Sequence, residues 1–131
     1  MDLRNLVPNE SFVKKLTNPI TGEILVCGDE TEMFIELFHI DSKTYRGRSA
    51  DLARKEGSKK NQKKSPEQNV RQLMEQYALT IKDWNIELDG EKVELTTEKA
   101  IEILYLLPWI KDVIVSELGD LSNFLPSQSD N

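Results

Sequence analysis

The chain has 131 residues, of which 38% are hydrophobic and 31% charged, and its formal net charge is −6. This length suits one compact domain and excludes a second full domain. The single cysteine, Cys27, excludes an internal disulfide, and no cysteine–histidine cluster accompanies it, so we expect a reducing compartment.

Residues 1–42 carry the signals of β-strands. SFVKKL is a short strand candidate, NPITGE supplies turn-forming residues, and ILVC continues a second strand. In MFIELFHI, residues 33–40, both alternating faces are largely apolar, which predicts a central or covered strand. The sequence therefore predicts about three antiparallel strands here, within an α+β fold.

Residues 43–65 predict a weakly anchored helix, from about Ser42 to Arg54, that ends in a basic linker. From Lys43 to Arg71 there are ten Lys or Arg residues against three Asp or Glu, whereas the rest of the chain is acidic. This separation favours docking to an acidic surface by long-range attraction. The only apolar residues of the helix are Tyr45, Ala50, Leu52 and Ala53.

Residues 66–125 form a mainly helical region. Ser65 predicts an N-cap, Pro66 fits the first helical position, and Gln68 completes a capping box. The apolar residues that follow recur at helical spacing and predict one buried stripe. They are Val70, Leu73, Met74, Tyr77, Ala78 and Ile81.

The remaining helices are separated by a turn and a proline. WNIELDGEKVEL is either a hairpin turning at Asp89-Gly90 or an extended connection. Thr97 is expected to cap the next helix, which ends or kinks at Leu107 because Pro108 disfavours helical geometry there. Residues 126–131 are polar and are expected to form a disordered tail.

The closing segment, PWIKDVIVSELGDLSNFL, has an apolar face that we expect to press partly on helix 66–82 and partly on another polypeptide. Aromatic residues beside helix junctions are common interface anchors, so two tryptophans are included in this prediction. The predicted partner-binding residues are Trp84, Leu106, Trp109, Ile110, Val113, Ile114, Leu118, Leu121, Phe124 and Leu125. Tyr105 and Val115 add further apolar surface outside the main stripes.

The sequence gives no positive sign of an enzyme. His39, the only histidine, has no serine, cysteine or carboxylate motif beside it, and Cys27 has no adjacent basic group to activate it. The carboxylates of ELDGEKVEL do not match a calcium-binding loop. We therefore expect no catalytic, cofactor-binding or metal-binding residues. With no leader pattern and no apolar run near about twenty residues, a cytoplasmic protein without membrane contact is expected.

Four stretches follow one another in a specific order: LTNPITGE, IDSKTYR, ALTIKDWNIELDGEKVELTTEKAIEIL and the closing PWIKDVIVSELGDLSNFL. This order, over about residues 14–125, resembles the tail assembly chaperones of long-tailed phages. The resemblance implies a non-virion protein of the host cytoplasm that binds the long, helical tape measure protein and keeps it soluble. In that family a frameshifted long form often recruits tail tube subunits.

Two alternatives remain open. The first is a structural phage component, such as a head–tail connector or tail terminator, whose strands join a ring by edge pairing. The second, weaker alternative is a nucleic-acid binder that uses the basic segment, although Tyr45 alone is available there for base stacking. A homo-oligomer is compatible with the first alternative and with the chaperone.

Overall fold

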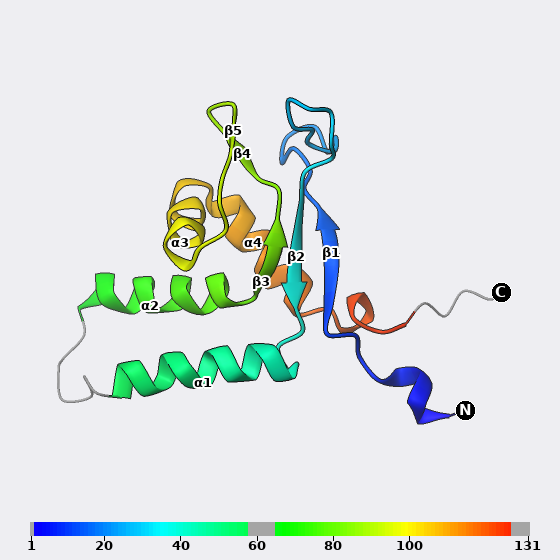
Figure 1. Ribbon diagram of the computed structural model, residues 1–131, viewed down its shortest axis with the longest axis vertical. Coiled ribbons are helices and arrows are strands. Elements are labelled where there is room, and N and C mark those ends of the chain that lie inside the picture. Colours follow the sequence, from blue (N-terminus) through cyan, green and yellow to red (C-terminus); the bar gives the residue numbers. More distant parts are fainter. Residues whose placement is uncertain (1, 58–64, 127–131) are drawn as a thin grey trace.

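The computed structural model describes residues 2–57 and 65–126 and has an α+β fold (Figure 1). Three antiparallel strands form one sheet in the order β1 (Ser11–Lys15), β2 (Phe34–Phe38) and β3 (Ile81–Trp84). The helices lie beside and behind this sheet, and the main core fills the space between them. The predicted fold class is therefore confirmed.

Strand β2 is central, as its two apolar faces predict. Ile35 and Leu37 are both fully buried on its inner face, and the strand pairs with β1 on one edge and β3 on the other. The expected second strand near residues 24–27 makes only isolated bridges, Thr17 with Ile24 and Val26 with Glu32. The third strand instead comes from residues 81–84, which follow the helix in sequence and reach the open edge of β2.

Helix α2 (Pro66–Leu79) begins as predicted. The Ser65 side chain accepts the Gln68 N–H, and the Gln68 side chain accepts the Ser65 N–H, which completes the capping box. Its predicted stripe is only partly correct. Met74 and Ala78 are buried, but Val70 and Leu73 are each 45% exposed because they lie at the margin of the packed face.

A tight hairpin follows the sheet. Strands β4 (Glu87–Leu88) and β5 (Glu91–Lys92) pair through a turn in which Asp89 and Gly90 have φ of 55° and 80°. Both positive φ angles are those of the type I′ turn that Asp-Gly favours. The hairpin alternative is thus confirmed over the extended connection.

Helices α3 (Thr97–Leu106) and α4 (Pro108–Leu118) meet at Leu107, where Pro108 starts the new helix as predicted. The N-cap of α3 is Thr96 and not Thr97, because the Thr96 hydroxyl accepts the Lys99 N–H at 3.1 Å. Two short 3-10 turns, η1 (Leu3–Leu6) and η2 (Leu121–Asn123), lie near the ends of the chain.

Helix α1 (Lys43–Gly57) corresponds to the predicted basic helix and lies alongside α2 (Figure 1). Its first turn is capped by Ser42, whose Oγ accepts the Tyr45 N–H at 3.2 Å. The predicted basic linker lies mostly outside the described residues, since 58–64 are not among them. Of the predicted tail, only Pro126 is described.

Candidate partner-binding surface

Four of the ten predicted partner-binding residues are part of the protein's own core. Trp84, Ile110, Ile114 and Phe124 have exposed fractions of 6%, 1%, 0% and 0%. Ile110 and Ile114 lie one turn apart on α4 and pack into the same cluster as Ile35 and Leu37 of β2. In this structure these four side chains are enclosed by the protein itself and offer no surface to a partner.

Phe124, near the C-terminal end of the described residues, packs against the N-terminal part of the protein. Its ring meets Phe12 edge-on at a centroid distance of 5.1 Å and His39 at 4.8 Å. Its carbonyl also accepts the Asn9 N–H. Three rings therefore pack together at one end of the core: Phe12 of β1, His39 just after β2 and Phe124 just after η2.

The other six predicted residues keep exposed surface. Leu106 is 57% exposed and Leu121 is 53% exposed, and the rest are half-buried. The two additional residues, Tyr105 and Val115, are each 46% exposed. We call these eight residues the C-terminal apolar set: Tyr105, Leu106, Trp109, Val113, Val115, Leu118, Leu121 and Leu125. Trp109 and Leu118 of this set also pack against the main core, whereas Leu106 and Leu121 are more than half exposed.

Polar side chains are interspersed with this set. Lys99 pairs with Glu102 at 3.6 Å on α3, and Lys111 pairs with Asp112 at 3.7 Å on α4. Lys14 of β1 reaches Glu117 at 3.3 Å, which ties α4 to the sheet. Such exposed pairs add little stability, but they keep a partly apolar surface hydrated.

A second group of exposed apolar residues lies in the N-terminal half and is not among the predicted partner-binding residues. Val13 is 50% exposed on β1, opposite Glu36 of β2, while Ile24 and Val26 are 43% and 54% exposed. The alternation of SFVKK contained the signal, since Val13 faces away from Phe12. These residues lie far along the chain from the C-terminal apolar set.

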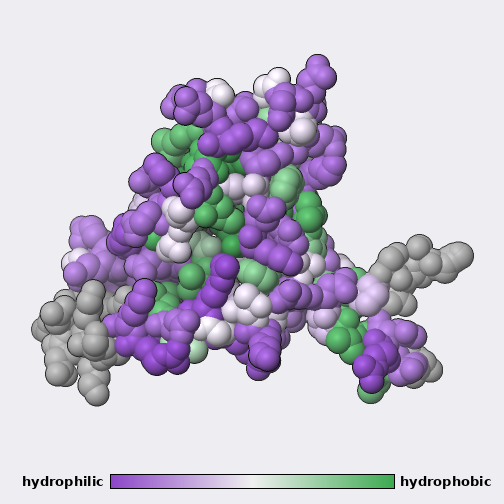
Figure 2. All heavy atoms as spheres, in the orientation of Figure 1, coloured by the Kyte–Doolittle hydropathy of each residue, from purple (hydrophilic) through white to green (hydrophobic). Residues whose placement is uncertain are grey.

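An open groove of about 1020 Å³ separates α1 from the body of the protein. Its apolar lining comes from Leu52, Ala78, Leu79, Ile81 and Leu95, and charged residues such as Arg48 and Glu98 surround it. Green side chains are visible between the purple ones of α1 and α2 in Figure 2. Helix α1 has few apolar residues, and none of its side chains at residues 43–55 is buried, so it packs only loosely against α2.

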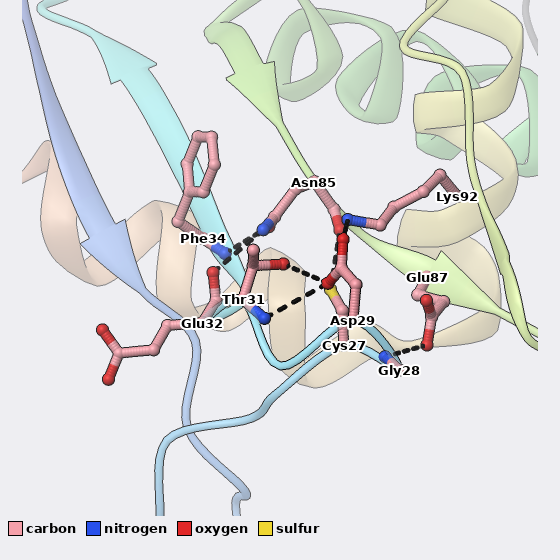
Figure 3. A network of polar contacts seen from close by, with 9 residues as sticks. All are labelled: Cys27, Gly28, Asp29, Thr31, Glu32, Phe34, Asn85, Glu87 and Lys92. Atoms are coloured by element: carbon pink, nitrogen blue, oxygen red, sulfur yellow. Dashed lines mark hydrogen bonds and ion pairs between the residues drawn. The ribbon is translucent and has the colours of Figure 1, made fainter.

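A polar network joins the loop before β2 to the hairpin (Figure 3). Asp29 accepts both the hydroxyl and the backbone N–H of Thr31, at 2.6 and 3.2 Å, and lies 3.4 Å from the Lys92 ammonium. The hydrogen bonds from Thr31 hold the pKa of Asp29 below its usual 3.8. Desolvation disfavours the charged form of Lys92, but its hydrogen bond and attraction to Asp29 raise its pKa above 10.5.

The same network orders the backbone of the loop. Asn85 accepts the Phe34 N–H at 2.7 Å and donates to the Glu32 carbonyl at 2.9 Å, while Glu87 accepts the Gly28 N–H at 3.0 Å. Cys27 is buried, and its thiol donates to the Asn85 carbonyl at 3.3 Å. Each of these groups has a structural partner, so the network fixes the loop against the hairpin.

His39 is buried, packs against Phe124 and accepts the Asp41 N–H at 3.3 Å. Within residues 2–57 and 65–126, no group of three or more His, Cys, Asp or Glu side chains is arranged to hold a metal ion. In the same ranges, no helix is both long and apolar enough to span a membrane.

Comparisons with protein families, with curated proteins and with solved structures find no match to this chain.

Proposed function

We propose that this chain is a phage tail assembly chaperone that binds the tape measure protein and keeps it soluble during tail assembly. The observation that supports it is the exposure of large apolar side chains on the C-terminal helices, with Leu106 at 57% and Leu121 at 53%. A long helical client exposes an apolar stripe before it is assembled, and an apolar helix surface can cover such a stripe. The order of sequence features described above supports the same class.

Burial divides the predicted binding residues into core residues and residues with exposed surface. Ile110, Ile114 and Phe124 hold the chaperone together, while the C-terminal apolar set contacts the client. Contact through the outer residues leaves the core intact, so binding requires no unfolding of α4. The acidic net charge of −6 helps to keep the complex soluble.

The test is co-expression with the tape measure protein of the same phage or prophage, followed by pull-down and measurement of soluble client. Leu106→Glu and Leu121→Glu place a charge on the proposed surface and should reduce both recovered and soluble client. Ile20→Glu is the matched control, because Ile20 is 92% exposed in a turn of the N-terminal half. Equal client solubility with and without the wild-type chain would contradict the proposal.

Two further measurements address the non-virion role and self-association. Mass spectrometry of purified particles should not detect this chain at the level of a structural subunit, whereas a connector or tail terminator would be present stoichiometrically. Sedimentation of the free chain, wild type and Leu106→Glu, shows whether a second copy covers the same residues. A concentration-dependent dimer lost in the variant would indicate that self-association competes with the client.

A further inference from the structure

Helix α1 is attached to the body of the protein differently from the other helices. Helices α2, α3 and α4 each bury apolar residues, whereas none of the α1 side chains described, residues 43–55, is buried. Tyr45, Ser49 and Leu52 are half-buried, and the others are exposed. Since burial of apolar area is the main force that holds a helix in place, α1 is held weakly along its length.

The start of α1 is fixed by polar contacts. Ser42 caps the helix, and the Thr44 hydroxyl donates to Glu10 beside β1 at 2.6 Å. Beyond this first turn, Gly47 adds no packing, since nothing lies within 4 Å of the position its Cβ would take. Glycine in a helix interior also costs about 1 kcal/mol relative to alanine. The anchored first turn therefore leads into a helix with little stability of its own.

Arg48 joins α1 to the end of α2 and to the start of β3. Its guanidinium donates to the backbone carbonyls of Leu79 and Ile81, at 3.3 and 3.4 Å, and its Cζ lies 5.0 Å from the centre of the Phe38 ring. Lys82 of β3 approaches the same ring at 5.8 Å. Phe38 is only 3% exposed, and these two cationic side chains help to cover it.

The surface beneath α1 is apolar. Phe38 and Ile81 are almost fully buried where α1 and Arg48 approach, and Leu79 lines the adjoining groove. If α1 moved away about its anchored start, these three side chains would gain access to solvent. No α1 side chain among residues 43–55 belongs to the main core cluster, so movement of the helix would leave that cluster packed.

We propose that α1 is a detachable cover, held by Arg48, whose release uncovers an apolar strip formed by Phe38, Leu79 and Ile81. In the free protein, the Arg48 guanidinium lies over the Phe38 ring and α1 forms one wall of the groove that Leu79 and Ile81 line, so the helix limits the exposure of these apolar side chains. That the client then binds the strip rests on the proposed chaperone function, whereas detachment itself is a property of the free chain.

The test is hydrogen exchange of the full chain measured by mass spectrometry, without any client. In the wild type, amides of residues 47–55 should exchange at least about tenfold faster than those of residues 70–79, because α1 opens without global unfolding. Arg48→Ala should accelerate exchange in α1 by a further factor of about ten, the effect expected for losing hydrogen bonds from a charged donor. Exchange in α2 and β2 should stay unchanged.

Arg46→Ala is the matched control, because Arg46 is an exposed arginine on the same helix whose described contact is a backbone hydrogen bond to Ser42. Its exchange should match that of the wild type. Equal protection of α1 and α2, or uniform acceleration throughout the Arg48→Ala chain, would overturn the proposal. Failure of Arg48→Ala to fold would overturn it too, since α1 would then belong to the cooperative core.

The two proposals fail separately. If α1 detaches but no client is bound, the proposed chaperone function is wrong, whereas the proposal that α1 detaches still holds. If the client binds with equal affinity to wild type and Arg48→Ala, and exchange in α1 is as slow as in α2, the cover is wrong and the C-terminal apolar set suffices.

Discussion

The ring of Phe124, near the end of the described chain, meets the ring of Phe12 in the first strand edge-on, with 5.1 Å between their centroids and an interplanar angle of 76°. Because Phe124 has no exposed surface, this contact is an internal packing contact and not a binding site. It joins η2 to the sheet and closes one end of the core. The segment that carries Phe124 therefore contributes to the packing of the fold.

Phe124→Ala should destabilise the protein by about 3–5 kcal/mol, since it removes a buried aromatic ring and leaves a cavity. The measurement is urea unfolding followed by tryptophan fluorescence, with Leu125→Ala, a half-buried neighbour, as the milder comparison. Loss of client binding with an unchanged unfolding midpoint would contradict the assignment of Phe124 to the core.

Leu106→Glu and Leu121→Glu should each change the free energy of unfolding by no more than about 0.5 kcal/mol, because both side chains are more than half exposed. Thermal unfolding of the free variants checks this expectation before any binding experiment. A drop as large as that of Phe124→Ala would show that these residues are structural, and a loss of binding could then not be assigned to the surface.

Gly90→Ala should destabilise the hairpin by about 1–2 kcal/mol. Gly90 has φ of 80°, and no atom lies within 4 Å of an added Cβ, so the cost comes from the left-handed backbone and not from a clash. Gly47→Ala is the opposite case, because Gly47 lies in α1 without a positive φ and alanine favours a helix. Circular dichroism during thermal unfolding should show a lower midpoint for the first variant only.

The Asp29–Lys92 pair predicts how stability depends on pH. The pKa of Asp29 is lowered in the folded protein, so its contribution is present above the usual value of 3.8 and is lost as pH falls through the lower folded value. The pKa of Lys92 is raised, so its contribution is present below 10.5 and is lost as pH rises through the higher folded value.

In Asp29→Asn, the thermal midpoint should therefore fall less steeply than in the wild type as pH is lowered into the acid range. In Lys92→Met, it should fall less steeply than in the wild type as pH is raised into the alkaline range. Thermal midpoints recorded between about pH 2 and pH 12 measure both slopes. Because both groups are solvent-exposed, the changes should be small and should shrink in high salt. Parallel wild-type and variant profiles would contradict the linkage.

Local signals in the sequence predicted several elements correctly. The capping box of Ser65 and Gln68, the Asp89-Gly90 turn and the start of a helix at Pro108 all appear in the structure. Each depends on interactions between residues a few positions apart, which is why short stretches were sufficient. The two apolar faces of β2 likewise predicted a central or covered strand, and the structure places it between β1 and β3.

The sequence by itself determined the start of α2, the start of α4 and the Asp89-Gly90 turn, and that the C-terminal half is rich in apolar residues. Only the tertiary structure decided that residues 81–84 pair with β2, and that Ile110, Ile114 and Phe124 face inward while Leu106 and Leu121 face solvent. Periodicity identifies an apolar face but cannot say what covers it. That depends on packing among segments far apart in the chain. Here the core that includes the sheet covers Ile110 and Ile114, and Leu106 and Leu121 stay exposed.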